Sequence, residues 1–530
     1  MTFPIKKTRP VGLLLALVLA GSCLAEDWPQ GSGPRGDFNT QQARAPLAWS
    51  VSLNQNVAWT AVLPETGQSS PVIWGDRVFV TTMKPVEAEA ETGKDIVAWC
   101  LSARDGSVLW KREIEGGYQT QLSAPFGDAS SPPAVTDGKH VWFLNPTGRL
   151  ASFDMDGNEV WSREFRSVVR TQPVLYDGMI ILHRQVYLPD ERGHFTHENK
   201  EAPHEKWTQL QAIDAASGDV RWTSECGVNM GAVPVVQRRE DGLDVLVVGR
   251  GGGHSPPETP EGVSMIRADN GKTLWTLALQ KFMSTQTYPV IGGDALVFHG
   301  SDHLWVNAKT GKISRKVSLV KDVPVRRWTE SGYETRVETL EEKARPITQQ
   351  SNLLVGRYHY FRAYTRNYLG RVDTETGAVE YLELPLQVLR APGKPEQVLW
   401  NAEQRPGDLA PIAEKRFRGN ISYTSLRHNR VENSRGLKVM GDARAIGNGW
   451  GHTASPLPTA FGDRLYVPIL SGLVFVIDAR AKTLDEGAVL ARNDLGPLGE
   501  AFTRASITSN GERIYAHTIQ GVVAFGSGGE

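Results

Sequence analysis

With 530 residues, of which 8% are aromatic and 22% charged, the chain has the composition of a large globular protein rather than a disordered one. Its formal net charge of −1 is far from the strongly basic balance of nucleic-acid-binding proteins, so we expect no nucleic-acid partner. Length alone suggests several domains, but a chain of this length can also form one domain when it folds as a closed ring of repeats.

The first 25 residues have the pattern of an export signal, because three basic residues precede a short apolar run over 11–20 and the segment ends at Ala25. That run is about half of the roughly 20 residues needed to cross a bilayer, so we expect a mature chain without a transmembrane span. Loss of the leader changes the net charge from −1 to −4. The alternative is a lipoprotein signal with Cys23 as the lipidated residue. Either signal predicts a periplasmic or outer-membrane-associated protein, and residues 26–44 are expected to be an extended segment.

Strand-like runs then recur along the chain, separated by two kinds of glycine turn. The first kind precedes a short β-branched or aromatic run, as Gly75 precedes residues 78–80, and it occurs eight times. In the second kind, Asp, Asn or Ser comes directly before Gly, and a tryptophan follows four positions after the Gly. These residue types favour the tight turn of a β-hairpin. Its clear copies end at Trp110, Trp161, Trp222 and Trp275. Two weaker copies carry Arg315 and Tyr381 at the tryptophan position.

The two ends of the repeat region together account for one blade. The last repeat, 505–526, contains only three predicted strands, and segment 48–62, which contains Trp59, is a predicted outer strand without a blade of its own. Pairing them closes a ring and leaves no large unpaired edge, whereas an open sandwich leaves the orphan strand unexplained. The sequence therefore predicts an all-β fold, an eight-bladed β-propeller of four-stranded antiparallel blades over 45–530, closed by the N-terminal strand. Insertions are expected at about 187–206, 323–345 and 386–453.

Residues 212–222, which read AIDAASGDVRW, resemble the tryptophan-docking repeat of the quinoprotein-like propellers. That family includes pyrroloquinoline-quinone (PQQ)-dependent alcohol dehydrogenases and the propeller lipoprotein of the outer-membrane β-barrel assembly machine. The resemblance covers about 45–526 and is specific for the fold rather than for a function, because the repeated residues are core and hairpin residues. It implies that one set of tryptophans docks adjacent blades instead of holding a cofactor: Trp59, Trp110, Trp161, Trp222 and Trp275. The opening motif DWPQ at 27–30 also resembles the start of exported propellers of this family.

The dehydrogenases of the family would show vicinal cysteines beside the quinone and an oxygen ligand set for Ca²⁺. After the leader only Cys100 and Cys226 remain, and they either pair or stay as buried thiols. We therefore expect no catalytic residue, no metal site and no cofactor. The alternative is a dehydrogenase of alcohols or sugars that binds PQQ and calcium in the central funnel. Its candidate ligands come from loops and strand starts, namely Arg184, Arg250, His303, His452 and Arg504.

Three insertions or loops add polar groups. Segment 192–205 gathers three histidines and three glutamates, but their spacing matches no standard ligand pattern, so we interpret it as solvated, with a metal site as the alternative. The glycine-rich stretch 249–254 runs into prolines rather than a helix, which favours a flexible loop over a phosphate cradle. The insertion 386–453 is rich in Arg and Lys, which would attract an anionic partner such as a polysaccharide or an acidic protein surface.

Loops on a rigid scaffold commonly carry recognition. The favoured prediction is thus an exported, monomeric, non-catalytic scaffold that holds a protein or glycan partner at the cell envelope.

Overall fold

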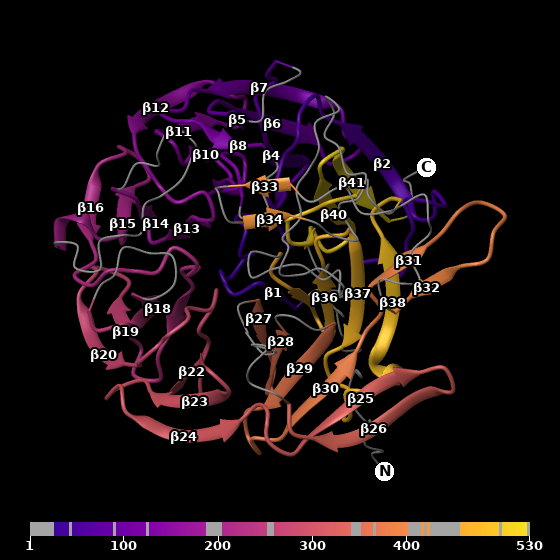
Figure 1. Cartoon of the computed structure of the whole chain (residues 1–530). Coiled ribbons are helices and arrows are strands. Elements are labelled where there is room, and N and C mark those ends of the chain that lie inside the picture. The colour runs from indigo at the N-terminus through magenta and orange to yellow at the C-terminus, as the bar shows by residue number, and fades with distance from the viewer. Residues whose placement is uncertain are drawn as a thin grey trace, which may run out of the picture.

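The computed structural model describes residues 26–41, 45–87, 92–122, 127–186, 204–251, 259–340, 351–363, 367–400, 415–417, 421–423, 456–497 and 501–526. They form eight antiparallel blades around a central axis, so the predicted eight-bladed β-propeller is confirmed (Figure 1). In each blade the first strand lies next to the axis and the fourth lies at the rim. No helix among these residues is long and apolar enough to cross a bilayer.

The first four blades follow one another without a crossover. Blade one contains β3 (Val72–Trp74), β4 (Arg77–Met83), β6 (Ile96–Ser102) and β7 (Val108–Ile114). Blade two contains β9 (Val135–Thr136), β10 (His140–Asn145), β11 (Arg149–Asp154) and β12 (Glu159–Glu164). Blade three contains β13 (Val174–Tyr176), β14 (Met179–Arg184), β15 (Gln209–Asp214) and β16 (Val220–Thr223). Blade four contains β17 (Val236–Arg238), β18 (Asp244–Arg250), β19 (Gly262–Arg267) and β20 (Thr273–Ala278).

The other four blades include the ring closure and two enlarged sheets. Blade five contains β21 (Val290–Ile291), β22 (Asp294–His299), β23 (Asp302–Asn307) and β24 (Ile313–Ser318). Blade six contains β27 (Asn352–Val355), β28 (Tyr358–Arg362), β29 (Tyr368–Asp373) and β30 (Val379–Glu383). Blade seven contains β35 (Thr459–Phe461), β36 (Arg464–Pro468), β37 (Leu473–Asp478) and β38 (Val489–Asp494). Blade eight contains β39 (Thr508–Ser509), β40 (Ile514–Thr518), β41 (Gly521–Phe525) and the N-terminal β2 (Val57–Val62).

Several short elements lie outside the plain blades. The hairpin of β25 (Val323–Thr329) and β26 (Gly332–Glu338) extends blade six, because β25 pairs parallel to β30. Strand β1 (Asn39–Thr40) pairs parallel to β35 and extends blade seven. The remaining ribbons are β5 (Thr92–Gly93) with β8 (Thr120–Gln121), β31 (Gln387–Leu389) with β32 (Gln397–Leu399), and β33 (Lys415–Phe417) with β34 (Ile421–Tyr423). Two 3-10 turns are η1 (His204–Lys206) and η7 (Glu486–Ala488).

The two glycine turns of the sequence repeat occupy fixed places in the blades. The first kind joins the inner strand to the second strand, where for example Gly178 has a φ of +69°, a conformation that favours glycine. The second kind joins the third strand to the rim strand. Along a rim strand most side chains are exposed, but the tryptophan is buried, as in β7, where Val108 and Leu109 face solvent and Trp110 is 9% exposed. Burial therefore falls between blades, and the core is a series of inter-blade clusters.

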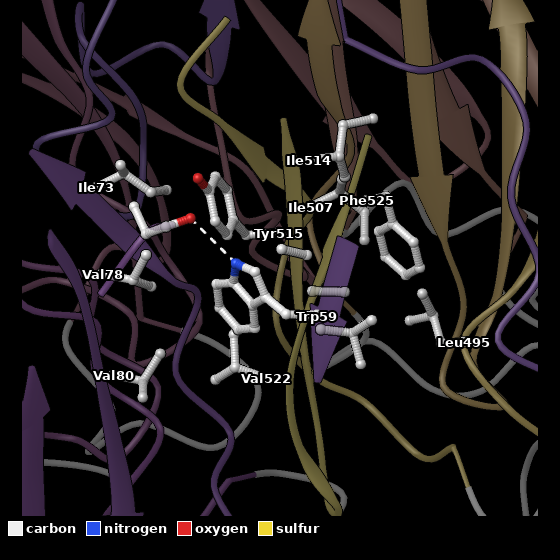
Figure 2. Close-up of a cluster of buried hydrophobic side chains, with 14 of the residues drawn as sticks. Trp59, Ile73, Val78, Val80, Leu495, Ile507, Ile514, Tyr515, Val522 and Phe525 are labelled. Carbon is white, nitrogen blue, oxygen red and sulfur yellow. Dashed lines mark hydrogen bonds between the residues drawn. The ribbon is translucent and has the colours of Figure 1, made fainter. Parts of the chain in front are cut away.

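Strand β2 closes the ring as the sequence predicts. It pairs antiparallel with β41, and Trp59 on β2 reaches blade one, where its indole N–H donates to the carbonyl of Ala103 at 3.0 Å. Figure 2 shows Trp59 between Tyr515 of blade eight and Ile73 and Val78 of blade one. The first and last blades are thereby joined by the same docking contact that joins their neighbours.

Candidate functional site

The five predicted docking tryptophans occupy equivalent places between blades. Each indole covers the glycine of the next blade's last turn so closely that a Cβ there would lie 2.6–2.9 Å from a ring atom. The pairs are Trp59 with Gly106, Trp110 with Gly157, Trp161 with Gly218, Trp222 with Gly271, and Trp275 with Gly311. Most of these indoles also donate to a carbonyl of that turn, as Trp275 does to Ala308 at 2.9 Å. Their surroundings are hydrophobic, so these side chains hold blades together rather than line a binding site.

A small polar pocket lies in the central channel. Its lining comes from the segments that precede the inner strands of seven of the blades: Gln68, Ser70, Ser131, Arg170, Gln172, Gly231, Gln286, Pro456, Leu457 and Arg504. The pocket has a volume of about 40 Å³. Gln68 accepts from the backbone N–H of Asp128 at 3.0 Å and from Ser131 at 2.9 Å, which ties blades one and two together at the channel. Burial lowers the pKa of Arg504 to about 9, and the nearby positive charge of Arg170 acts in the same direction.

The N-terminal segment connects the inner strands of several blades. Trp28 exchanges two backbone hydrogen bonds with Ile73 of β3, the side chain of Gln30 accepts from Leu175 N–H of β13 at 2.8 Å, and the segment then reaches β35 through β1. These contacts lie on the inner strands, further along the chain than the pocket residues that precede those strands. The DWPQ motif thus contacts blades one to three, and β1 further along the same segment reaches blade seven (Figure 1).

The structure brings few of the predicted funnel ligands together. Of those in the described residues, Arg504 lines the pocket, whereas Arg184, Arg250 and His303 do not. Arg184 and Arg250 end the second strands β14 and β18, and they bond within their own blades, to Gln209 at 3.1 Å and to Thr276 at 3.0 Å. His303 is fully buried on the third strand β23 and bonds His359 of blade six at 2.9 Å. Second and third strands face neighbouring blades rather than the axis, which explains these positions. His452 lies outside the described residues.

The described residues do not fit the quinone that the family's dehydrogenases carry. A pocket of about 40 Å³ is far below the roughly 300–1,000 Å³ of ordinary ligand pockets. Cys100 and Cys226 are buried in different hydrophobic clusters and are not joined by a disulfide, and burial raises the pKa of the Cys100 thiol to about 12. Within the described ranges no group of three or more His, Cys, Asp or Glu is placed to hold a metal ion. Most of the histidine-rich segment lies outside them, and His204 bonds the carbonyl of Glu225 at 2.9 Å.

A much larger groove lies at the rim of the ring, along β38. It has a volume of about 630 Å³. Its walls come from the N-terminal loop before β2, from rim strand β38, and from the two hairpins β25–β26 and β31–β32, which project beside β38 (Figure 1). The lining residues are Ala48, Trp49, Leu53, Gln55, Tyr333, Leu384, Pro385, Arg390, Lys394, Glu396, Trp400, Glu486, Val489, Leu490, Ala491, Arg492 and Asn493. We call this site the lateral groove.

A buried carboxylate anchors the walls of the lateral groove. Asp494, 2% exposed at the end of β38, accepts from Ser50 Oγ at 2.5 Å and from Ser52 N–H at 2.9 Å. It also accepts from Arg390 of the β31–β32 hairpin at 2.9 Å. Arg390 in turn bonds Glu396 on the same hairpin at 2.8 Å. One side chain therefore fixes both the N-terminal loop and the hairpin against blade seven.

Aromatic rings join the two hairpins. The indoles of Trp400 and Trp328 stack with centroids 4.6 Å apart and ring planes at 5°, and Tyr333 meets Trp400 edge-on at 5.7 Å. The Tyr333 hydroxyl donates to the carbonyl of Glu383 at 2.9 Å, and burial raises its pKa. Sequence reasoning did not find this groove. The only available signal was that both hairpins fall in segments expected to be insertions.

Residues 205–387 match the family described as outer membrane protein assembly factor BamB. Over that stretch, and in its propeller fold, the chain is similar to the PQQ-like propellers. A curated relative, polyvinylalcohol dehydrogenase of Sphingopyxis sp. (strain 113P3), is 23% identical over 248 residues, which cover 42% of this chain and 35% of the relative. The match thus spans about a third of that relative's length.

Solved structures with a similar fold have low sequence identities to this chain. BamB from Moraxella catarrhalis is 13% identical with a TM-score of 0.36, and the match covers 74% of this chain and 95% of that one. Quinohemoprotein alcohol dehydrogenase from Comamonas testosteroni is 13% identical with a TM-score of 0.49, and the match covers 96% of this chain and 82% of that one.

Proposed function

We propose that this chain is an exported, non-catalytic scaffold that binds a protein or glycan partner at the cell envelope through the lateral groove. The observation that carries the proposal is the contrast between the lateral groove and the channel pocket. The groove, at about 630 Å³, has the size of a ligand site, whereas the channel pocket, at about 40 Å³, holds little more than water. The groove is also built from hairpins that a plain blade does not need.

The family match supports the location and the class of function. Its description concerns an outer membrane protein assembly factor, which favours a role in holding another envelope component over a role in chemistry. An N-terminal export signal, expected from residues 1–25, agrees with that location. In the described residues many charged side chains form ion pairs with one another, as Arg390 does with Glu396 and Asp494.

A second candidate function is a PQQ-dependent dehydrogenase of a hydroxylated substrate, favoured by the match to polyvinylalcohol dehydrogenase. The test is to titrate the purified mature chain with PQQ and Ca²⁺ and to follow cofactor absorbance together with dye-linked oxidation of polyvinyl alcohol, ethanol and glucose. The scaffold proposal expects no turnover. Saturable cofactor binding with turnover would overturn it.

The scaffold proposal also has a positive test. A photo-crosslinking amino acid at position 490, a groove residue that is 41% exposed, should capture an envelope component in the native host. The same amino acid at position 274, which is 37% exposed on the rim of blade four, is the matched control and should not capture it. Equal capture at both positions would remove the groove from the proposal.

A further inference from the structure

We propose that the chain forms a twofold-symmetric dimer in which the outer edges of two copies of β26 pair antiparallel. The proposal concerns self-association, so it does not depend on the partner that the scaffold binds, and it departs from the monomer expected from the sequence. Three features carry it: a regular outer edge where the other blades have bulged ones, backbone groups that point outward from that edge, and a charge pattern that complements itself.

The outer edge of blade six differs from the outer edges of the other blades. In each of the other seven blades the rim strand carries a register shift where it pairs with its neighbour. Such a bulge twists an edge and hinders its pairing with another chain. In blade six, β30 has no such shift, but the β25–β26 hairpin covers it. β26 itself pairs with β25 in one unbroken register from Gly332 to Glu338, so blade six presents a regular outer edge.

The backbone groups of this edge face outward. β26 is the outermost of the six strands in its sheet, and the hairpin projects from the periphery of the propeller (Figure 1). The hairpin turns through two residues, so Thr329 and Gly332 form its first hydrogen-bonded pair. Hydrogen-bonded and non-hydrogen-bonded pairs then alternate, and Tyr333, Thr335 and Val337 direct their backbone N–H and C=O groups away from β25. No described strand pairs with that side of β26, which makes the edge a template for another strand.

The side chains of β26 complement those of a second copy in one register. An antiparallel pair centred on Thr335 places Glu334 of each copy opposite Arg336 of the other, and these side chains are 46% and 65% exposed. Within one copy Arg336 bonds Glu334 at 2.8 Å, so the dimer brings two ion pairs together with opposite charges facing each other. The same register places Tyr333 opposite Val337, which is 70% exposed. Opposite charges, and an aromatic ring facing a β-branched residue, are favourable cross-strand pairs.

The neighbouring registers are disfavoured. Centring the pair on Glu334 or on Arg336 would place that side chain opposite its own copy, and like charges directly opposite each other are destabilising. A slip of one residue would set outward backbone groups against inward ones and lose the hydrogen-bond ladder. The register centred on Thr335 satisfies both the ladder and the charges, as the self-complementary interface of a twofold dimer requires.

Sedimentation velocity of the mature full-length chain, over about 1–300 μM, tests the proposal. We expect a reversible monomer–dimer equilibrium with a Kd of about 1–100 μM, because an edge of seven residues buries less area than a permanent dimer does. Thr335→Pro should abolish the dimer, since it removes an outward N–H that the β25–β26 ladder does not use. Thr335→Ala keeps this N–H, so its Kd should stay within about threefold of that of the unmodified chain.

Charge reversal separates this register from other modes of self-association. Glu334→Arg and Arg336→Glu should each weaken the dimer by about tenfold or more, because each substitution brings like charges face to face. An equimolar mixture of the two variants should restore the affinity to within about threefold, since every charge then meets an opposite one across the mixed pair. The control is Glu159→Arg, at an exposed position on the rim strand of blade two, and it should leave the equilibrium unchanged.

A chain that stays monomeric at the highest concentration would overturn the proposal, and so would a dimer that Thr335→Pro leaves intact. Failure of the mixed charge variants to recover the dimer would also overturn it. If Thr335→Pro fails to fold, the charge variants still decide the question, because both substitutions are made at exposed positions. The scaffold proposal is tested separately, by crosslinking at position 490, and it can hold for a monomer or for a dimer.

Discussion

Arg315 covers Gly377 in the same way that a tryptophan covers a glycine in the preceding blades. A Cβ on Gly377 would lie 2.2 Å from Arg315 Nη2. The guanidinium donates to the carbonyl of Glu375 at 2.9 Å and to that of Thr376, and it lies over the ring of Trp305, 4.6 Å from the centroid. A planar cation with several donors thus replaces an indole, because the docking needs a flat group that satisfies turn carbonyls.

We expect Arg315→Lys to lower the free energy of unfolding by about 1 kcal/mol, since an ammonium group cannot reproduce the fork of donors or the flat contact with Gly377. Urea unfolding followed by tryptophan fluorescence measures the change. The control is Lys312→Ala, in the turn that precedes β24. Its side chain is exposed, so the substitution should have almost no effect. An equal effect of the two variants would show that Arg315 does not dock the blades.

Gly271→Ala should be more destabilising than Gly178→Ala, although the two glycines have nearly the same φ, +72° and +69°. Both substitutions place a Cβ in a left-handed conformation, which costs about 1 kcal/mol. At Gly271 the new Cβ would also lie 2.6 Å from the Trp222 ring, whereas nothing lies within 4 Å at Gly178. The difference in unfolding free energy, about 1–3 kcal/mol, isolates the docking contact. Equal losses would contradict it.

Stability should fall as the pH drops below about 6.5, because four buried histidines resist protonation. Burial lowers the pKa of His183 and His517 to about 4 and that of His359 to about 3, and it lowers that of His303 as well. The unfolded chain takes up these protons near pH 6.5 while the folded chain does not, so acid favours unfolding.

Each histidine contributes about 1.4 kcal/mol per pH unit between its unfolded and folded pKa values. Urea midpoints should therefore be nearly equal at pH 8.5 and 7.5, lower at pH 6.5, and lower again at pH 5.5. His183→Gln should reduce the slope below pH 6.5 by about a quarter. Midpoints that stay constant down to pH 5.5 would be incompatible with neutral buried histidines.

Asp494→Ala should lower the free energy of unfolding by about 3 kcal/mol or more, because it removes a buried carboxylate that bonds Ser50, Ser52 and Arg390. It should also loosen the β31–β32 hairpin and so lower the affinity of the lateral groove for any ligand, because two walls of the groove lose their anchor. Denaturant unfolding and limited proteolysis of the hairpin report the two effects. Asp302→Ala, which removes an exposed ion pair with Lys316, should change neither.

The sequence by itself determined the ring. Turn chemistry and strand alternation are local, and the first kind of glycine turn recurs eight times. The number of blades, the closing strand 57–62 and the docking tryptophans therefore followed from short stretches of chain. The funnel ligands did not follow, because the strand on which a residue lies decides whether it faces the axis or a neighbouring blade. His303, buried against His359, illustrates the difference.

Only the tertiary structure decided where the chain has concave sites. Trp400 meets Trp328, and Arg390 meets Asp494, across long stretches of sequence that meet only where the two hairpins pack beside β38. The parallel pairing of β25 with β30 likewise has no local signal. Such contacts depend on the positions of whole blades, since the groove is a space between elements and not a property of any one of them.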